Sequence, residues 1–393
     1  MVTGNYFPEI SGGTLQCRTL INALKSNIDF SVIATTNNSS SGKSAGLIYE
    51  DAVDGIKIYR IALSKDNTPF KINSLLRIFT LFLKHRRNFQ ILHMHGFTNK
   101  AVLLTILSKL FGKKILVKIT LLGIDDPYTI KRAGILGGLK YFFYSLSDLA
   151  VSPAPYLTER ARMAGFPRDR LVEIPNGVDT DIFRPADSAA ERELLRKELG
   201  LPEEKKIMLF VGYFSREKRP DLILQAWMRL REEWKDKGTV VFIGSRDAAT
   251  WGVDTGLVKW FDQQIKTRNM ENELKFVDKT HCIEKYYRAA DIFLFASKRE
   301  GLPNALLEAM ASALPCIATE LKGITDTLIN HEKDGLLVGQ DDTAGLAEAL
   351  NRLLLDAEFA DLLGKNASEK IKKEYNINNI SKRYAELYAG MLS

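Results

Sequence analysis

Cysteine and histidine are scarce in this sequence of 393 residues. The three cysteines, Cys17, Cys282 and Cys316, stand far apart without CxxC spacing, and the five histidines form no metal-ligand cluster. Such a sparse, odd set excludes a disulfide-framed secreted domain and is typical of a reducing compartment. We therefore expect a cytoplasmic protein with no structural metal.

Long apolar runs are also missing. The longest candidate, LLRIFTLFLK, contains Arg77 and is shorter than the ~18–20 residues that cross a membrane. The first ten residues, MVTGNYFPEI, lack the basic and apolar regions of a signal peptide. We expect neither a membrane-spanning helix nor a signal peptide.

The charge is unevenly distributed. The net charge is +7, but the stretch from Lys65 to Lys140 holds fourteen lysines and arginines against three aspartates. A local basic excess favours an anionic partner, and a solvated basic face is the alternative.

Short apolar runs alternate with amphipathic segments along the whole chain, apart from a polar stretch at 35–46 that is typical of a loop. Continuous apolar runs suit strands buried on both faces of a parallel sheet. The length favours two domains, and a Pro- and Gly-containing break near Arg184 separates the two series. The sequence thus predicts an α/β protein with two doubly wound Rossmann-like domains facing a central cleft. The expected domains are 1–184, 185–375 and a C-terminal helical segment, 376–393, that packs back on the first. The expected strands are FSVIATT, IKIYRIA, QILHMHG, KILVKIT and DLAVSP, then KIMLFVG, TVVFIGS, LKFVDK, IFLFAS, PCIAT and DGLLVG.

The stretch REGLPNALLEAM, which follows the strand IFLFAS, predicts a helix that begins at an anion site. Pro303 suits the first helical position because its missing N–H group costs nothing there. Backbone N–H groups around Leu302 and Asn304 would then bind a phosphate. Glu308, about one and a half turns along the helix, can accept hydrogen bonds from a ribose diol, while Glu300 and Gly301 lie nearer the sugar. The alternative is a capped helix with two solvated glutamates.

Two further loops have the composition of phosphate sites. In FVGYFSREKRPDLILQAW, Arg216, Lys218 and Arg219 follow a strand and precede a helix, where cations can neutralise a diphosphate. Basic residues are unfavourable at a helix start unless an anion binds there, although surface charge is the alternative. Near the N-terminus, Gly12 and Gly13 open a helix and let backbone approach a phosphate closely.

These motifs, together with YFPEISGG, IPNGVDTDIFRP and KDGLLV in that order, resemble the GT-B glycosyltransferases of family 4 over nearly the whole chain. The resemblance implies that Glu308 binds the donor ribose, Glu300 the donor sugar and Lys218 the diphosphate. It also implies that Gly12 and Gly13 face the donor across the cleft.

Members of this family retain the anomeric configuration and need no bound metal, so we expect no cofactor beyond a nucleoside-diphosphate sugar. The sequence departs from the family at Tyr213, where many members have Arg, and at Leu122, where many have His. The first strand, MVT, is also shorter than usual. Arg216 is a candidate for the missing Arg, and Lys118 or Asp125 for the missing polar group. Backbone near Val277 is expected to read the base.

The expected function is transfer of a sugar to a hydroxyl of a cell-envelope glycan or glycolipid. The segment 71–89 has one apolar and one basic side, so it either lies on an anionic membrane at the inner face or packs on the core with its basic side in water. Nucleic acid is not an expected partner. The alternative functions are a nucleotide-sugar 2-epimerase of the same fold and a non-catalytic nucleotide-sugar-binding scaffold.

Overall fold

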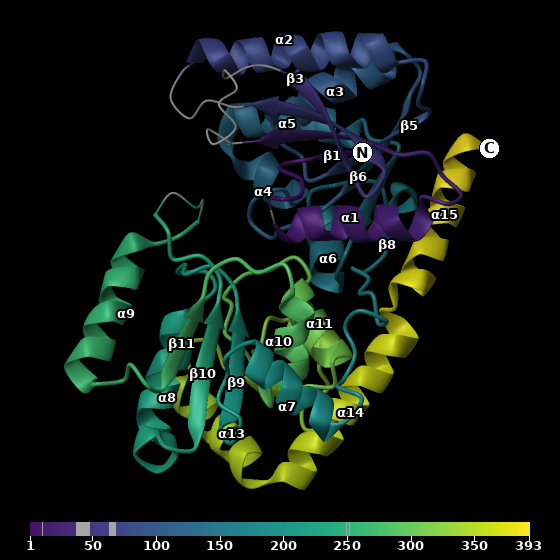
Figure 1. Cartoon of the computed structure of the whole chain (residues 1–393). Coiled ribbons are helices and arrows are strands. Elements are labelled where there is room, and N and C mark those ends of the chain that lie inside the picture. Colours follow the sequence, from purple (N-terminus) through teal and green to yellow (C-terminus); the bar gives the residue numbers. More distant parts are fainter. Residues whose placement is uncertain (10, 37–47, 63–67, 249, 251) are drawn as a thin grey trace. The chain divides into compact units, whose positions relative to one another are not determined.

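The structure is a computed structural model that describes residues 1–9, 11–36, 48–62, 68–248, 250 and 252–393. Most of the polar stretch expected as a loop at 35–46, and Lys65 of the basic segment, lie outside these residues. The chain divides into two compact units, called here unit 1 (Met1–Gly177 with Ile377–Ser393) and unit 2 (Val178–Asn376). Each unit is one α/β layer structure with its own sheet (Figure 1).

Unit 1 contains an eight-stranded sheet in the order β3-β4-β2-β1-β5-β6-β7-β8. All neighbours pair in parallel except β3 and β4, which form an antiparallel hairpin through Asp54 and Gly55. Both turn residues have positive φ angles, 53° and 79°, as a tight two-residue hairpin requires. The strands are β1 Val2–Thr3, β2 Ser31–Thr36, β3 Ile48–Val53, β4 Ile56–Ala62, β5 Ile91–His95, β6 Lys114–Lys118, β7 Leu149–Ser152 and β8 Leu171–Glu173.

The helices of unit 1 include one from the far end of the chain. Figure 1 shows α15, in yellow, beside α1, in purple. Tyr384 and Tyr388 of α15 pack with Leu20 and Leu116 in one hydrophobic cluster, so the C-terminal segment is part of this unit. The helices are α1 Gly12–Leu24, α2 Thr68–His85, α3 Asn99–Leu110, α4 Pro127–Arg132, α5 Gly134–Ser145, α6 Pro155–Met163 and α15 Ile377–Leu392.

Unit 2 contains a six-stranded sheet, entirely parallel, in the order β11-β10-β9-β12-β13-β14. All six strands coincide with apolar runs expected from the sequence. The strands are β9 Lys206–Val211, β10 Gly238–Ile243, β11 Leu274–Val277, β12 Ile292–Phe295, β13 Cys316–Thr319 and β14 Leu336–Val338. The helices are α7 Ala189–Glu198, α8 Pro220–Trp234, α9 Thr255–Arg268, α10 Ile283–Ala289, α11 Asn304–Ala311, α12 Thr325–Leu328, α13 Thr343–Leu355 and α14 Ala357–Glu374.

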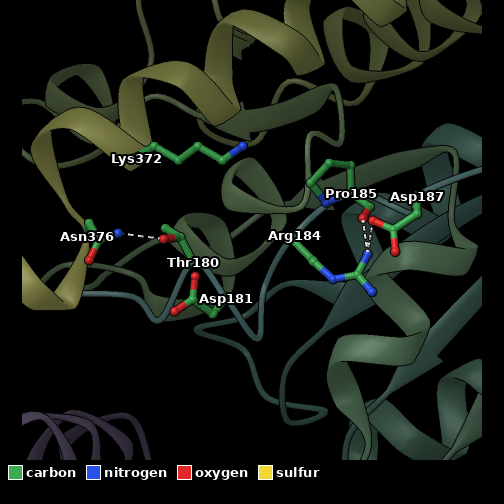
Figure 2. A pocket seen from close by; sticks show the side chains of 7 residues that line it. All are labelled: Thr180, Asp181, Arg184, Pro185, Asp187, Lys372 and Asn376. Atoms are coloured by element: carbon green, nitrogen blue, oxygen red, sulfur yellow. Dashed lines mark hydrogen bonds and ion pairs between the residues drawn. The ribbon is translucent and has the colours of Figure 1, made fainter.

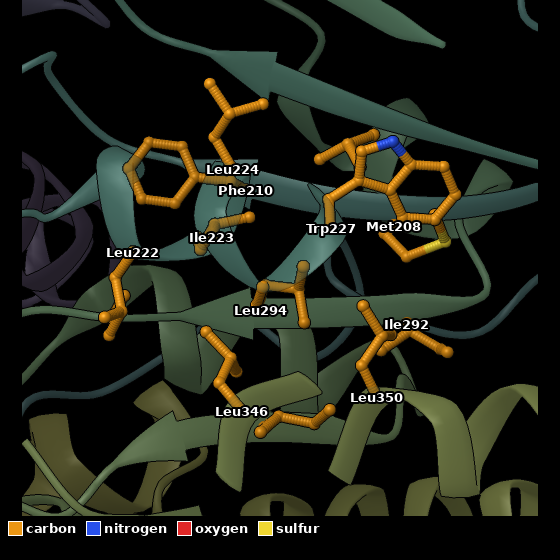
Figure 3. Packing of buried hydrophobic residues seen from close by; sticks show 14 of the residues in the cluster. Met208, Phe210, Leu222, Ile223, Leu224, Trp227, Ile292, Leu294, Leu346 and Leu350 are labelled. Carbon is orange, nitrogen blue, oxygen red and sulfur yellow. The ribbon is translucent and has the colours of Figure 1, made fainter. Parts of the chain in front are cut away.

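The core of unit 2 lies between its sheet and the helix pair α8 and α13. Figure 3 shows Trp227 of α8 and Leu350 of α13 among the buried side chains on this face. Trp227 is fully buried, and its indole Nε1 donates to a carboxylate oxygen of Glu273 at 2.9 Å. The buried indole therefore keeps a hydrogen bond as well as its packing.

The chain enters and leaves unit 2 through two paired segments. Val178 forms a parallel bridge with Asn376, and the Asn376 amide donates to Thr180 Oγ1 at 2.5 Å (Figure 2). The crossings follow Gly177 and Asn376, whereas the sequence suggests boundaries after residues 184 and 375. Arg184 lies within unit 2 because its guanidinium pairs with Asp187 at 2.7 Å and with Glu191 of α7 at 3.3 Å.

Comparison with the expected elements confirms the α/β class and shows where pattern reasoning failed. The edge strands β3 and β8 and the helices α4, α5, α9 and α12 were not expected. β3 is partly exposed and has the adjacent acids Glu50 and Asp51 at its centre, so it lacks the continuous apolar run of a central strand. None of the described helices is long and apolar enough to cross a membrane.

Candidate active site

Two loops at the carboxyl ends of neighbouring strands are joined by charged pairs. The loop after β9 carries Glu217 and Lys218, and the loop after β12 carries Arg299 and Glu300. Arg299 pairs with Glu217, and Lys218 Nζ lies 2.5 Å from Glu300 Oε1. The Lys298 backbone N–H also donates to the Glu217 carbonyl at 2.8 Å. These contacts hold the two predicted site loops together within unit 2.

Glu300 is almost completely buried, with 7% of its surface exposed. Lys218 supplies the counter-charge, and a buried carboxylate without such a partner would be strongly destabilising. The structure thus brings together two predicted site residues that are far apart in sequence. Both belong to loops at the carboxyl edge of a parallel sheet, where ligands of such folds bind.

The other two cations of the predicted clamp have different partners. Arg216 Nε donates to Asp254 Oδ2 at 2.8 Å, and 67% of the Arg216 side chain is exposed. The hydrogen bond from Arg216 lowers the pKa of Asp254 below its ordinary value. Arg219 adopts a left-handed backbone conformation, with φ 54°, and pairs with Asp221 at 3.0 Å and also with Asp341. Among the three, Lys218 is therefore the cation that contacts Glu300.

Helix α11 begins at Asn304, so Pro303 occupies the N-cap position and not the expected first helical position. The backbone of Pro303 is extended, with φ −76° and ψ 111°, which an N-cap residue requires. No side chain caps this helix end by a hydrogen bond. Gly301, Leu302 and Pro303 are buried, and they form the connection between Glu300 and the helix. The positive end of the helix dipole thus lies a few residues after Glu300.

Glu308 projects from α11 and is held by a residue that sequence reasoning missed. The hydroxyl of Tyr287, on α10, donates to Glu308 Oε2 at 3.0 Å and approaches the Ala305 carbonyl at 3.2 Å. Desolvation raises the pKa of Glu308 to about 7, and the hydrogen bond from Tyr287 opposes that rise. Tyr287 gave no signal in sequence because its run, EKYYRAA, reads as an ordinary amphipathic helix.

Val277 lines a small pocket of about 220 Å³ at the carboxyl ends of β10 and β11. Gly244 has a φ of 148°, and a Cβ atom there would lie 2.0 Å from the Gly212 carbonyl oxygen. Only glycine fits this close approach of two strand ends. Arg246 stacks over the Phe276 ring at 4.3 Å and forms another wall of the pocket. Sequence reasoning found Val277 but not Gly244 or Arg246.

The predicted glycine loop lies in unit 1. Gly12 and Gly13 are the first two residues of α1, and the Ser11 hydroxyl caps the helix by accepting the Thr14 N–H at 3.3 Å. A Cβ atom on Gly13 would meet Thr120 at 3.8 Å, which is ordinary contact. The structure therefore places the glycines at a helix N-terminus as expected. Their role toward a donor remains a prediction.

Asp125 also lies in unit 1, and its carboxylate is engaged by the protein. It accepts hydrogen bonds from the Thr120 backbone and hydroxyl at 2.9 and 2.7 Å, and from the Leu121 N–H at 2.7 Å. Burial raises the pKa of Asp125 to about 6. This geometry fits a carboxylate that holds the loop after β6, and gives no support to its predicted catalytic role.

Asp126 forms a different set of contacts. It caps α4 by accepting the Thr129 N–H at 3.0 Å and pairs with Arg160 at 2.9 Å. In the described part of the chain, no group of three or more His, Cys, Asp or Glu residues is arranged to hold a metal ion. The expectation of a metal-independent enzyme remains a prediction.

A larger pocket, of about 550 Å³, lies at the paired segments where the chain crosses between units (Figure 2). Figure 2 shows Lys372 extending from α14 on one side, and Arg184 bonded to Asp187 on the other. None of the residues predicted for the donor site lines this pocket. Its lining residues are Thr180, Asp181, Arg184, Pro185, Asp187, Lys372 and Asn376.

The two parallel-sheet units, one with a charged site at its carboxyl edge, define a protein with the fold of the GT-B glycosyltransferases. The solved structure of HepE from Anabaena in complex with UDP-glucose has a TM-score of 0.79 to this chain at 14% identity, covering 99% of both chains. The fold predicted from the sequence is thereby confirmed.

The family model described as "Glycosyl transferases group 1" matches residues 191–370, which is most of unit 2. The match covers just under half of the chain, and together with the fold it supports a glycosyltransferase of the GT-B class.

Curated relatives extend the similarity over more of the chain. The N-acetyl-alpha-D-glucosaminyl L-malate synthase of Bacillus anthracis is 26% identical over 307 residues, covering 78% of this chain and 76% of that protein. The D-inositol 3-phosphate glycosyltransferase 2 of Catenulispora acidiphila is 31% identical over 254 residues, covering 62% and 56%. The chain spans about half the length of most other curated relatives that it matches.

Proposed function

We propose that this protein transfers a sugar from a nucleoside-diphosphate sugar to an acceptor hydroxyl, with retention of the anomeric configuration and without a bound metal. The observation that carries the proposal is the ion pair between Lys218 and Glu300, whose charged atoms are 2.5 Å apart. Glu300 lies just before helix α11, and Glu308 lies about one turn inside that helix. A cation, a helix N-terminus and two carboxylates in this order match the phosphates, the sugar and the ribose of one donor molecule.

The chemistry of this arrangement follows from where charge develops. The bond between the anomeric carbon and the diphosphate oxygen breaks, and negative charge grows on the leaving oxygens. Lys218 and the positive end of α11 stabilise that charge most in the transition state, which is the condition for accelerating the step. The acceptor oxygen bonds to the anomeric carbon from the same face. Its proton passes to the leaving phosphate oxygen, which makes a separate protein base unnecessary.

Donor binding would change the partners of Lys218 and Glu300. In the described state the Lys218 ammonium neutralises Glu300. When the diphosphate takes over the ammonium, the Glu300 carboxylate becomes free to accept hydrogen bonds from sugar hydroxyls. Glu308 would accept hydrogen bonds from the ribose in the same way, and these bonds are strongest when its carboxylate is ionised.

UDP-glucose is the first donor to test. The pocket beside Val277 has a volume of about 220 Å³ and is walled by the Phe276 ring, so a flat base fits it. The HepE structure was determined with UDP-glucose, which makes uracil the first candidate base. We assign the acceptor side to unit 1 and propose a cell-envelope glycan or glycolipid hydroxyl as its ligand, with an anionic membrane surface as a further partner.

A thermal-shift panel of UDP, GDP, ADP and their sugar conjugates tests donor binding directly. A ligand at a hundred times its Kd should stabilise the protein by about 2.7 kcal/mol. Absence of a shift with every nucleotide would overturn the proposal. Transfer is then measured with the donor that binds best and an acceptor extract, and NMR of the product gives the anomeric configuration.

The alternatives give different results in the same assay. A 2-epimerase would convert the donor to its C2 epimer without any acceptor, and a scaffold would bind the donor without any transfer. Activity that EDTA abolishes and Mg²⁺ or Mn²⁺ restores would contradict the metal-independent mechanism.

A further inference from the structure

The helical hairpin α4–α5 of unit 1 contains no acidic residue. From Pro127 to Ser147 the sequence reads PYTIKRAGILGGLKYFFYSLS, with Lys131, Arg132 and Lys140 as its charged residues. Lys131 donates to the Ala164 carbonyl at 2.7 Å, and Arg132 donates to the Tyr128 hydroxyl at 2.8 Å. Both acceptors are neutral, and among the described residues neither Lys131 nor Arg132 forms an ion pair.

Helix α5 exposes a stripe of large apolar side chains. Ile135 is 93% exposed and Leu136 79%, while Leu139 and Phe142 are 54% and 55% exposed. Their spacing, i, i+1, i+4 and i+7, places all four on one face of the helix. Singly exposed apolar residues are common on protein surfaces, but a continuous apolar face of this kind marks an interaction site.

The opposite side of α5 is fixed to unit 1. Tyr144 is fully buried and packs edge-to-face against Phe97 and Phe166. Gly137 lies so close to the preceding helix that a Cβ atom there would be 2.4 Å from the Ile130 carbonyl oxygen. The exposed stripe is therefore presented by an anchored helix.

Helix α2, the other amphipathic candidate, uses its apolar side differently. Ile78, Leu81 and Phe82 are buried, and Ile78 and Phe82 belong to the core cluster of unit 1. This supports the core-packed alternative for the segment 71–89. Leu76 of α2 is 59% exposed and Leu110 of α3 is 72% exposed, but among the described residues of the unit the two most exposed large apolar side chains, Ile135 and Leu136, lie on α5.

We propose that the α5 face, defined as Ile135, Leu136, Leu139 and Phe142, docks unit 1 onto an anionic lipid surface. This deepens the membrane partner proposed above and is independent of the donor chemistry. The apolar side chains would enter the boundary between headgroups and acyl chains, and the neighbouring cations would meet lipid phosphates.

A second copy of the chain is a less suitable occupant. A two-fold contact places the same surface against itself, so Lys131, Arg132 and Lys140 of one copy would approach those of the other. Without carboxylates in the hairpin, nothing in this segment compensates that repulsion. Anionic lipid headgroups supply the missing negative charge. Charge complementarity therefore favours a lipid surface.

Vesicle flotation of the full chain tests the proposal. The wild type should bind vesicles of phosphatidylcholine with phosphatidylglycerol about ten-fold more than pure phosphatidylcholine, and added salt should reduce the binding. Ile135→Ser/Leu136→Ser should lower binding to the anionic vesicles by about ten-fold or more. Leu355→Ser/Leu362→Ser, at exposed positions of unit 2, is the matched control and should bind like the wild type.

A second measurement locates the contact. In Phe142→Trp, brominated lipid in the anionic vesicles should quench the added tryptophan, whereas the added tryptophan of Leu362→Trp should be unaffected. Thermal unfolding and the UDP-glucose shift of each variant establish that folding and donor binding persist, so failure of the donor site would be recognised separately.

Three outcomes would overturn the proposal. The first is that the wild type does not bind anionic vesicles at low salt. The second is that the Ile135→Ser/Leu136→Ser variant binds them as well as the wild type does. The third is that light scattering shows a dimer for the wild type and a monomer for this variant, which would assign the α5 face to a second copy of the chain.

Discussion

Unit 2 pairs the charges on its site loops, whereas unit 1 buries polar groups that have few partners. In unit 2, Lys218 meets Glu300, and Arg219 meets Asp221 and Asp341. In unit 1, both ring nitrogens of His95 are buried with no hydrogen-bond partner among the described residues. The first arrangement suits charged groups that exchange one partner for another when a ligand arrives. The second suits groups that stay neutral.

The titratable neighbours of His95 are also buried in an environment that favours their neutral forms. Its ring stacks on His93 at 4.4 Å, and burial holds the pKa of both imidazoles well below the usual range. Lys118 lies over the Tyr384 ring at 5.6 Å, and burial lowers its pKa to about 7. Burial disfavours charge throughout this cluster.

The surfaces of the two units differ as well. Among the described residues, all but four of the exposed large hydrophobic side chains belong to unit 1, the exceptions being Ile182, Leu194, Leu355 and Leu362. This contrast fits the proposal that unit 2 binds an ionic small molecule and unit 1 a larger apolar partner. Four predictions test this contrast, beginning with those that act on the donor site.

Lys218→Ala should produce the largest effect. Removing one group that stabilises a developing anion typically lowers kcat by about 10²- to 10³-fold. Arg216→Ala is the matched control and should lose much less, because Arg216 is mostly exposed and bonded to Asp254. Steady-state kinetics of both variants measure the difference. A change in KM alone for Lys218→Ala would mean that this lysine holds only the ground state.

Glu308→Ala should weaken donor binding by about 1.5–3 kcal/mol, which is roughly ten- to a hundred-fold in Kd. Because the pKa of Glu308 is about 7, its carboxylate protonates as the pH falls through 7 and accepts ribose hydrogen bonds less well. Donor affinity of the wild type should therefore fall from pH 8 to pH 6, and that of Glu308→Gln should be weaker and flat. Calorimetric titration measures both. A wild-type affinity that ignores pH would remove Glu308 from the ribose site.

Two glycine substitutions should have opposite signs. Gly244→Ala places a Cβ atom 2.0 Å from the Gly212 carbonyl oxygen and should destabilise unit 2 by about 1–3 kcal/mol. Gly138→Ala in α5 meets nothing within 4 Å and should stabilise unit 1 by about 0.5–1 kcal/mol. Chemical denaturation measures both, and equal effects would contradict the described packing.

Lys118→Met should change the pH dependence of the free energy of unfolding. The folded pKa of about 7 lies below the unfolded value of about 10.4, so above pH 7 the unfolded chain binds more protons. The wild-type unfolding free energy should therefore gain a contribution from Lys118 as the pH rises from 7 to 8.5. That contribution has a slope of up to about one proton, and Lys118→Met should lose it.

Denaturation of the wild type and the variant at each pH measures that slope. Subtraction of the two curves removes the opposing contribution of Cys17, whose pKa burial raises to about 12. Parallel curves would show that Lys118 is not buried as described.

Patterns along the chain determined much of unit 2. Its six central strands are continuous apolar runs flanked by turns, and this signal is local. The helix start after Gly301, with a glutamate on either side of it, could also be predicted from the sequence, because capping and dipole effects act within a few residues. In unit 1 the same reasoning missed the edge strands β3 and β8, since an edge strand needs no continuous apolar run.

Tertiary structure decided the partners. Nothing local in sequence joins Lys218 to Glu300, or Tyr287 to Glu308, because each pair forms only when neighbouring strands and helices align. The sequence offered Asp125 only as a candidate for the missing polar group, and in the structure the loop after β6 places three hydrogen-bond donors around its carboxylate. Likewise, the apolar residues of α5 resembled core in composition. Only the tertiary structure shows that Tyr144 is buried and Ile135 is exposed, because the helix packs on the unit with one face and leaves the other face in solvent.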